Sequence, residues 1–360
     1  MPCLHLTRVV FIFMHQSQAI YQLDSLLAEV SIEVAKDAAC YFPLANGRYE
    51  VKPGLMPLGV DLGNDRIDQQ VFQIDSNFAH YRQAKLIERN ERLSKYYQTY
   101  NYCGVAGAIA CLLITRLTQE YPQYFQLERL STGDFALHCY LTAETLYLDA
   151  DWQLQGAQSN VTPAYVSTLD ALASQVQEDL AVVCRGSDGA NWLSAIHLCY
   201  PNHWAAEDKI CKDFALVHAP VAGMEKINQR ASAIVNTMIA REPMVRFAWG
   251  LSTDTRLNHH PQPPLGISVE QWQGREFNID NPQLYLRIER QTIWGLPEYQ
   301  AALFTIRTYF RDCRAIKQDA VLRPKLVAAL DSMTADSLVY KGLAESKNSI
   351  LRWLNDESCA

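Results

Sequence analysis

Residues 284–310, LYLRIERQTIWGLPEYQAALFTIRTYF, contain two runs of alternating apolar and polar side chains on either side of Gly295-Leu296-Pro297. A period of two places successive side chains on opposite faces of an extended chain, so each run predicts a β-strand. The Gly and Pro between them predict the connecting loop. The stretch therefore predicts two paired strands and, with them, an antiparallel sheet.

The polar residues of these two strands are unusual for a sheet and have two interpretations. They include Arg287, Glu289 and Arg307. One interpretation is a solvated face with cross-strand ion pairs. The other is a charged face that lines a pocket, where arginines bind carboxylates bidentately and a glutamate pairs with a cation. Both interpretations remain open at the level of the residues.

A second informative stretch, residues 196–221, reads IHLCYPNHWAAEDKICKDFALVHAPV. The apolar run 193–200 predicts a strand that ends at Pro201, because proline cannot continue a ladder. Asn202 is a favourable N-cap, so a helix is expected in the segment after Trp204. His203 at this corner is a candidate ligand for a metal or a haem iron, and the alternative is an ordinary packed histidine.

The remaining pattern predicts helices and strands in separate runs. Helices are expected at 76–99, 103–121, 222–241 and 334–355, and strands at 134–148, 179–200 and 244–252. His259 and His260 lie in a Pro-rich segment that reads as an ordinary loop. This order favours an α+β fold with one antiparallel sheet over a doubly wound parallel one.

Composition limits the class of protein. With 49% hydrophobic and 20% charged residues, the 360-residue chain has ordinary globular usage. A net charge of −7 without a basic stripe argues against nucleic acid as a partner. The apolar run at 9–14 is too short to span a membrane, so no membrane association is expected. Ten scattered cysteines without a C-x-x-C pair indicate thiols in a reducing compartment, the cytoplasm.

Taken together, several segments resemble one family. The blocks YPNHWA (200–205) with HAPV (218–221), and LRIERQT (286–292) with LFTIRTY (303–309), look like the haem-dependent oxidative N-demethylases, the haem subunit of dimethylamine monooxygenase-type systems. Residues 41–60 and 72–85 also resemble the entry segment of that family. The resemblance covers roughly residues 40–325, estimated without an alignment.

The resemblance implies a PAS-like antiparallel sheet that holds haem b, with flanking helices. Residue by residue, it implies His203 as the axial ligand of the haem iron, with His218 as the competitor. It further implies Arg287 and Arg307 as partners of the haem propionates, and Glu289 as the acceptor for the ammonium group of a small amine substrate. Dioxygen is the co-substrate. Electrons from NAD(P)H are expected through a flavin and iron–sulfur reductase on another chain.

The expected organisation has three parts. Residues 1–40 form an N-terminal extension with a helix at about 19–38, residues 41–325 form the haem-binding domain, and residues 326–360 form a C-terminal helical tail. Two other classes of function stay open. One is a haem-based sensor or binding protein without turnover. The other is a non-haem metal hydrolase that uses His203, His218 and Asp208.

Overall fold

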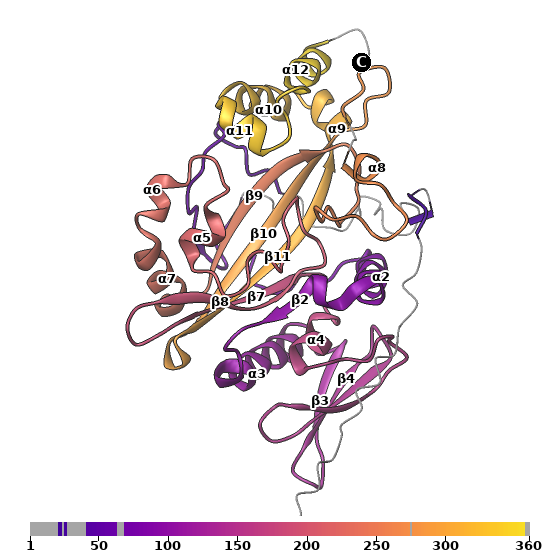
Figure 1. The fold of residues 1–360 in the computed structure, drawn as a ribbon, viewed down its shortest axis with the longest axis vertical. Coiled ribbons are helices and arrows are strands. Elements are labelled where there is room, and N and C mark those ends of the chain that lie inside the picture. Colours follow the sequence, from indigo (N-terminus) through magenta and orange to yellow (C-terminus); the bar gives the residue numbers. More distant parts are fainter. Residues whose placement is uncertain (1–20, 24, 27–40, 63–67, 274–275, 357–360) are drawn as a thin grey trace, which may run out of the picture.

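The central element is a seven-stranded antiparallel sheet. The computed structural model describes residues 21–23, 25–26, 41–62, 68–273 and 276–356, and the helix expected at 19–38 lies almost entirely outside them. The strand order is β1-β9-β10-β11-β7-β8-β2 (Figure 1). The strands are β1 (Met56–Pro57), β9 (Met244–Ser252), β10 (Tyr285–Leu296), β11 (Ala301–Asp312), β7 (Asp179–Arg185), β8 (Asn191–His197) and β2 (Tyr97–Thr99). The α+β prediction is therefore confirmed, but the strands form two antiparallel sheets where one was expected.

The hairpin of β10 and β11 is the longest pairing in the sheet. The two predicted strands do pair, and their register runs from Tyr285↔Asp312 to Leu296↔Ala301. The turn is a 3₁₀ segment, Pro297–Tyr299, closed by Gln300 in the left-handed conformation. Residues paired across strands share a face of the sheet. The register therefore separates the polar side chains of the hairpin into two sets.

We name the two faces of the sheet after one residue of each set. The Glu289 face carries the side chains of Arg287, Glu289 and Gln291, and the Arg290 face carries those of Arg290 and its partner Arg307. Strand β9 continues both sets on the other side of β10.

Helices and a second sheet cover part of the Arg290 face. Helix α3 (Cys103–Glu120) packs Ile109, Leu113 and Leu117 in one hydrophobic cluster with Leu180 and Leu303 of the sheet. Helices α2 (Phe78–Tyr96) and α4 (Thr168–Ala173) lie beside it (Figure 1). The same cluster includes side chains from a four-stranded antiparallel meander. Its strands are β3 (Phe125–Arg129), β4 (Phe135–Cys139), β5 (Glu144–Leu148) and β6 (Leu154–Gln158).

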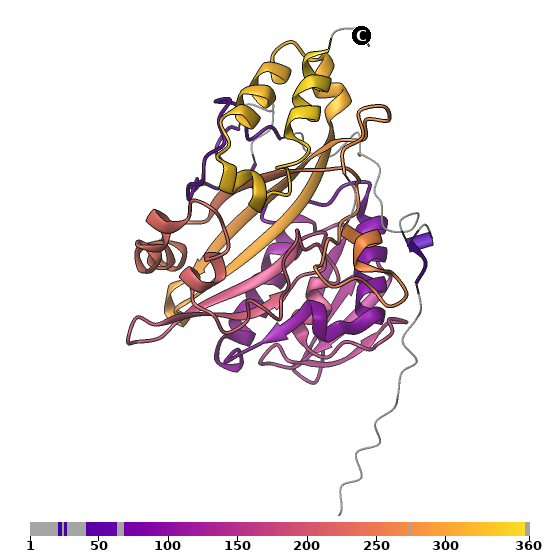
Figure 2. The same cartoon turned by 45° about the horizontal axis from the view of Figure 1, so that its top comes forward.

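The C-terminal helices pack on the central hairpin. They are α9 (Cys313–Gln318), α10 (Leu322–Asp331), α11 (Ala335–Tyr340) and α12 (Lys347–Asn355), and they gather at one end of β9–β11 (Figures 1 and 2). Leu330 and Trp353 share a cluster with Leu286 and Ile288 of β10. The expected boundary between residues 325 and 326 falls inside α10, and the single helix expected at 334–355 is two helices.

Three short helices lie toward the Glu289 face: α5 (Phe214–His218), α6 (Glu225–Asn228) and α7 (Ala231–Ala240) (Figure 1). Helix α7 comes so close to β10 that a Cβ on Gly295 would lie 2.1 Å from the carbonyl oxygen of Ile239. Only glycine permits this approach. The structure has two helices, α6 and α7, where a single helix was expected at 222–241.

One expected helix does not form. The segment after Trp204 forms turns up to Lys212, and Asn202 pairs with His259 in a β-bridge instead of capping a helix. Backbone hydrogen bonds from Leu193 to Lys212, and from Cys211 to Leu193, hold this segment along β8. These tertiary bonds override the local helix preference. A further short helix, α8 (Val269–Gln273), follows the loop that contains His259.

Candidate functional site

A row of polar side chains crosses the middle of the Glu289 face. Arg287 lies opposite Gly250, Glu289 lies between Ala248 and Thr308, and Gln291 lies opposite Arg246. Neighbouring members of one face are two residues apart along a strand, about 7 Å. Arg246 and Gly250 therefore mark the ends of a row roughly 13 Å long. Ala248 and Gly250 contribute little or no side chain to this row.

Three buried polar atoms of this row have no hydrogen-bond partner among the described residues. They are Nε of Arg246, Nε of Arg287 and Oγ1 of Thr308. An unsatisfied buried donor or acceptor costs ~1–3 kcal/mol, and native proteins contain few of them. Three such atoms on one face of neighbouring strands indicate that a polar ligand completes the site.

Glu289 lies in the middle of this row and makes few polar contacts. Its carboxylate accepts one hydrogen bond, from Nε2 of Gln291 at 3.0 Å. It is only partly buried, and no ion pair within 4 Å involves it in the part of the chain that the structure describes. Its charge nevertheless acts on Arg246, Arg287 and Lys341, so three cations surround it at longer range.

Lys341 reaches the row from the C-terminal helices. A Cβ on Gly250 would lie 3.9 Å from its Nζ and 4.0 Å from Nδ2 of Asn202. Burial lowers the pKa of Lys341, and the Glu289 carboxylate opposes that effect. The sequence interpretation missed Lys341, because it lies in the tail that was expected to fall outside the haem-binding domain. No local pattern around Lys341 marks it as a site residue.

His218 is the last residue of α5 and faces Arg246. Asp213 caps the helix by accepting a hydrogen bond from the Leu216 amide at 2.7 Å. The Nδ1 atom of His218 lies 2.8 Å from the carbonyl oxygen of Phe214, to which it donates, and the ring packs on the Phe214 ring. Burial and the nearby Arg246 lower the pKa of His218 to about 4, although the bond to Phe214 opposes this. The ring is therefore neutral near pH 7, with Nε2 as its unprotonated nitrogen.

His203 lies at the other end of the row. Its backbone is left-handed (φ +63°), and its amide donates to the carbonyl of His259 at 3.0 Å. The two imidazole rings are 5.2 Å apart. Although part of the side chain is exposed, packing and the cations Arg287 and Arg256 lower the pKa of His203 to about 4. No hydrogen bond orients its ring among the described residues.

Arg287 ties two loops across this end of the face. Its guanidinium donates to the carbonyls of Tyr200 at 2.7 Å and Leu257 at 2.9 Å, and lies 3.2 Å from Nδ1 of His259. His259 in turn contacts Asp254 at 3.2 Å. The loop of His259 and His260, expected to be ordinary, is buried and forms a wall of the site. The pair of histidines in a Pro-rich segment was the feature of the sequence that could have identified this loop as part of the site.

Arg307 lies on the opposite face of the sheet from Arg287. It pairs with Arg290 across the hairpin, binds Asp75 at 2.7 Å and donates to the carbonyl of Gln73. The structure therefore brings Arg287, Glu289, His203 and His218 to one face and leaves Arg307 on the other. Arg287 and Arg307 do not converge on one ligand.

The described residues contain no metal centre made of protein side chains. No group of three or more His, Cys, Asp or Glu side chains there is arranged to hold a metal ion. In the same part of the chain, no helix is long and apolar enough to cross a bilayer.

The site is thus a polar patch on an antiparallel sheet, with a neutral, oriented histidine at one end and cations in excess. It suits a protein that binds an anionic prosthetic group with one imidazole ligand. Comparison with known families agrees: residues 64–351 match the haem-dependent oxidative N-demethylase, alpha subunit-like family. The match spans most of the chain, and the protein belongs to this family.

The residues present fit a haem. Arg246, Arg287 and Lys341 carry three positive charges and Glu289 one negative charge, which leaves two positive charges on this face. A haem b brings two propionate carboxylates, which match that excess. The unpartnered Nε atoms of Arg246 and Arg287 offer donors to such groups. His218, with its free Nε2, lies at the Arg246 end of the same row.

Proposed function

We propose that this protein is the haem-binding subunit of an enzyme that oxidatively removes a methyl group from a small secondary amine such as dimethylamine. Its products are formaldehyde and the shorter amine, and it uses dioxygen. The observation that carries the proposal is Glu289: a carboxylate with one hydrogen bond, on the same face as the neutral His218. When bound, haem supplies the one-electron and dioxygen chemistry that side chains lack.

His218 is our proposed axial ligand. Ligating histidines nearly always donate their other ring N–H to a carbonyl or carboxylate, which fixes the tautomer and the ring orientation. The bond from Nδ1 of His218 to Phe214 meets this rule, and it leaves Nε2 as the free nitrogen. His203 has no such bond and is the second candidate. Its left-handed backbone next to the row suits a residue that lines the pocket.

Glu289 is our proposed amine-binding residue. A secondary amine is protonated near neutral pH, and its N–H groups donate to a carboxylate in short, charge-assisted bonds. Gln291 orients that carboxylate through its hydrogen bond at 3.0 Å. An amine held by this carboxylate presents its methyl group in a fixed position.

The partners that we propose for the haem propionates differ from the pair that the resemblance implied, Arg287 and Arg307. We propose Arg246, Arg287 and Lys341, which share the Glu289 face. Arg307 is satisfied on the opposite face by Asp75.

Electrons come, in this proposal, from NAD(P)H through a flavin and iron–sulfur reductase on another chain. The family description, alpha subunit-like, suggests a partner subunit. The sequence of this chain has no C-x-x-C pair and no convincing strand–G-x-G-x-x-G–helix unit that would carry these cofactors.

We also propose the PAS-like designation and a cytoplasmic location. Five consecutive strands, β7 to β11, lie in the spatial order second, first, fifth, fourth, third, which supports the designation. The described cysteines, among them Cys139, Cys184 and Cys199, are free thiols, as expected in a reducing compartment.

The test is a haem-reconstituted protein titrated with dimethylamine and then reduced in the presence of dioxygen. We expect an intense Soret band, an amine-dependent spectral shift and about one formaldehyde per turnover. A Soret band without any amine response or formaldehyde would favour a sensor or binding protein. Absence of stoichiometric haem would refute the proposal.

A further inference from the structure

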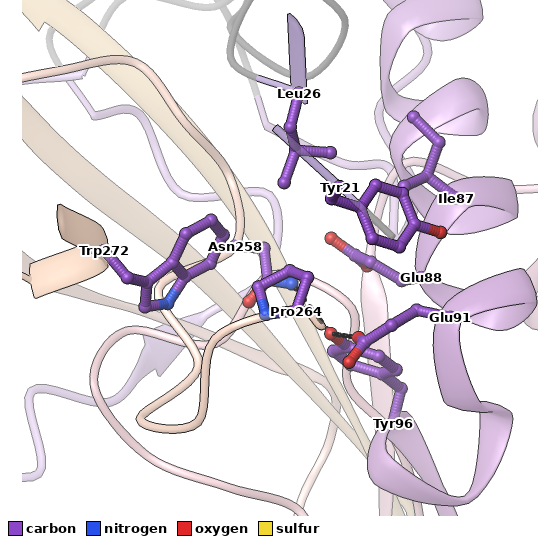
Figure 3. A pocket seen from close by; sticks show the side chains of 9 residues that line it. All are labelled: Tyr21, Leu26, Ile87, Glu88, Glu91, Tyr96, Asn258, Pro264 and Trp272. Atoms are coloured by element: carbon purple, nitrogen blue, oxygen red, sulfur yellow. Dashed lines mark hydrogen bonds between the residues drawn. The ribbon is translucent and has the colours of Figure 1, made fainter. Parts of the chain in front are cut away.

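A small cavity lies beside α2, away from the Glu289 face. Its apolar and aromatic walls are Tyr21, Leu26, Ile87, Tyr96, Pro264 and Trp272, and its polar lining residues are Glu88, Glu91 and Asn258 (Figure 3). The cavity volume is about 10 Å³, which is room for one water-sized group.

Glu88 is the unexplained residue of this cavity. It is 3% exposed, and neither carboxylate oxygen makes a hydrogen bond among the described residues. Figure 3 shows this carboxylate directed into the space between Tyr21 and Asn258. The Cys199 thiol is a weak donor near this carboxylate and lowers its pKa, but it does not offset the effect of burial.

The other polar lining residues are already engaged. Glu91 accepts hydrogen bonds from Nζ of Lys95 at 2.9 Å and from the Tyr96 hydroxyl. Asn258 donates to the Tyr96 hydroxyl at 3.0 Å and accepts from the His260 amide at 2.8 Å. Only Glu88 retains unused acceptors in the cavity.

The charges around Glu88 do not balance it. Burial raises the pKa of Glu88, and the negative charges of Asp179 and Glu91 raise it further. Lys95 is bound to Glu91, and Lys85 donates to the carbonyls of Ala173 and Glu178. A buried carboxylate without a partner is unfavourable, so Glu88 requires either a proton or a cation.

We propose that this cavity binds one ammonium ion, with Glu88 as its carboxylate partner. N–H donors match two unused carboxylate oxygens at short range. The walls offer a hard metal ion few of the six or more oxygen ligands it prefers, whereas aromatic rings tolerate an ammonium group. Exclusion of water strengthens the pairing of the charges.

Part of this site comes from a segment that precedes the family match at residue 64. Tyr21 and Leu26 close one side of the cavity, and the Tyr21 amide donates to the carbonyl of Leu265 at 2.8 Å. The other seven of the nine lining residues lie within the family match. The inference does not depend on the proposed function.

The experiment is calorimetric titration of the haem-loaded full chain with ammonium chloride near pH 7, against sodium chloride at equal ionic strength. All titrations use a protein that carries Glu289→Gln, because the proposed amine site would otherwise bind the same cation. Glu88→Gln keeps the shape of the side chain and removes its charge. Glu225→Gln, at an exposed position on α6, is the matched control for loss of one charge.

We expect binding of ammonium, but not of sodium, with release of up to one proton per cation as Glu88 ionises. The affinity should fall at least tenfold when Glu88→Gln is added and remain within twofold when Glu225→Gln is added. Equal binding by Glu88→Gln, or equal binding of sodium, would overturn the proposal. A Glu289→Gln protein with Glu88 intact that binds no cation would also overturn it and identify Glu88 as a neutral buried acid.

Discussion

The two faces of the central sheet carry the same residue types in opposite states. On the Arg290 face, Nε of Arg290 binds Asp68 at 2.7 Å and Arg307 binds Asp75 at 2.7 Å. On the Glu289 face, Arg246 and Arg287 form no such ion pair among the described residues and keep unpartnered Nε atoms. Arg287 and Arg290 thus have different roles, although they lie three residues apart on β10. What surrounds the side chain, rather than its type, separates a structural ion pair from a ligand-binding group.

The largest effect that this comparison predicts is on His218. Replacement of His218 by Ala removes the one imidazole of the Glu289 face that has an oriented ring and a free Nε2. We expect loss of stoichiometric haem and of the Soret band, measured by absorption after reconstitution. His203→Ala is the matched variant and should retain haem. Loss of haem in His203→Ala alone would transfer the ligand role to His203 and keep the family assignment.

The second effect concerns stability and belongs to the Arg290 face. Arg290→Met leaves Asp68 buried without its partner, which typically costs ~3–5 kcal/mol in free energy of unfolding. Chemical denaturation followed by circular dichroism measures it. Arg314→Met breaks the exposed pair with Asp312 and should cost less than ~1 kcal/mol. If Arg290→Met leaves stability intact and instead weakens haem binding, the distinction between the two faces fails.

Sequence predicted the sheet better than it predicted the site. The alternation in 284–310 and the apolar run at 244–252 gave β9, β10 and β11 closely, because the period of two is a local property. The helix after Trp204 was wrong, because backbone bonds to β8 and the bridge of Asn202 to His259 are not local.

The same limit explains the site residues. Alternation alone shows that Arg287 and Glu289 share a face, and the family blocks singled out both histidines. The face of Arg307 depends on the register of β11 against β10, which is set by the turn at Pro297–Tyr299. Lys341 depends on how the C-terminal helices pack across β9, and no period in the sequence encodes that contact.

The third prediction sharpens the role of the Glu289 face. Glu289→Gln keeps the shape of the side chain but removes the charge that we propose to bind the ammonium group. Loss of one partner of a charged, desolvated pair costs ~2–5 kcal/mol, so we expect kcat/KM for dimethylamine to fall by about 10² or more. Formaldehyde production measures it, with an unchanged Soret band as the control for haem binding.

Gln291→Leu tests the supporting contact. It removes only the hydrogen bond that orients the Glu289 carboxylate, so a loss of about fivefold to tenfold is expected, in line with ~1 kcal/mol for one hydrogen bond. Full amine turnover in Glu289→Gln would exclude this carboxylate as the amine partner while leaving the haem assignment untouched.

The last prediction concerns the pH dependence of stability, and it again contrasts the two faces. On the Arg290 face, burial raises the pKa of Glu178 to about 7, although Arg307 and Arg290 oppose this. On the Glu289 face, burial lowers the pKa of His218 to about 4. A raised carboxyl pKa means that the folded state holds its proton while the unfolded chain ionises. The stability that Glu178 contributes is therefore present below pH 4.5 and is lost as pH rises toward 7.

The lowered pKa of His218 has the opposite sign, because the stability it contributes is present above pH 6.5 and is lost as pH falls toward 4. Glu178→Gln removes only the first contribution and keeps an acceptor for the Gln73 amide. Relative to wild type, its free energy of unfolding should rise by on the order of 1–3 kcal/mol between pH 4.5 and pH 7, as measured by denaturation at each pH. A difference that stays constant with pH would show that Glu178 is already ionised in the folded protein, held by the two arginines. The Arg290 face would then be a closed network of charges rather than one that shares a proton.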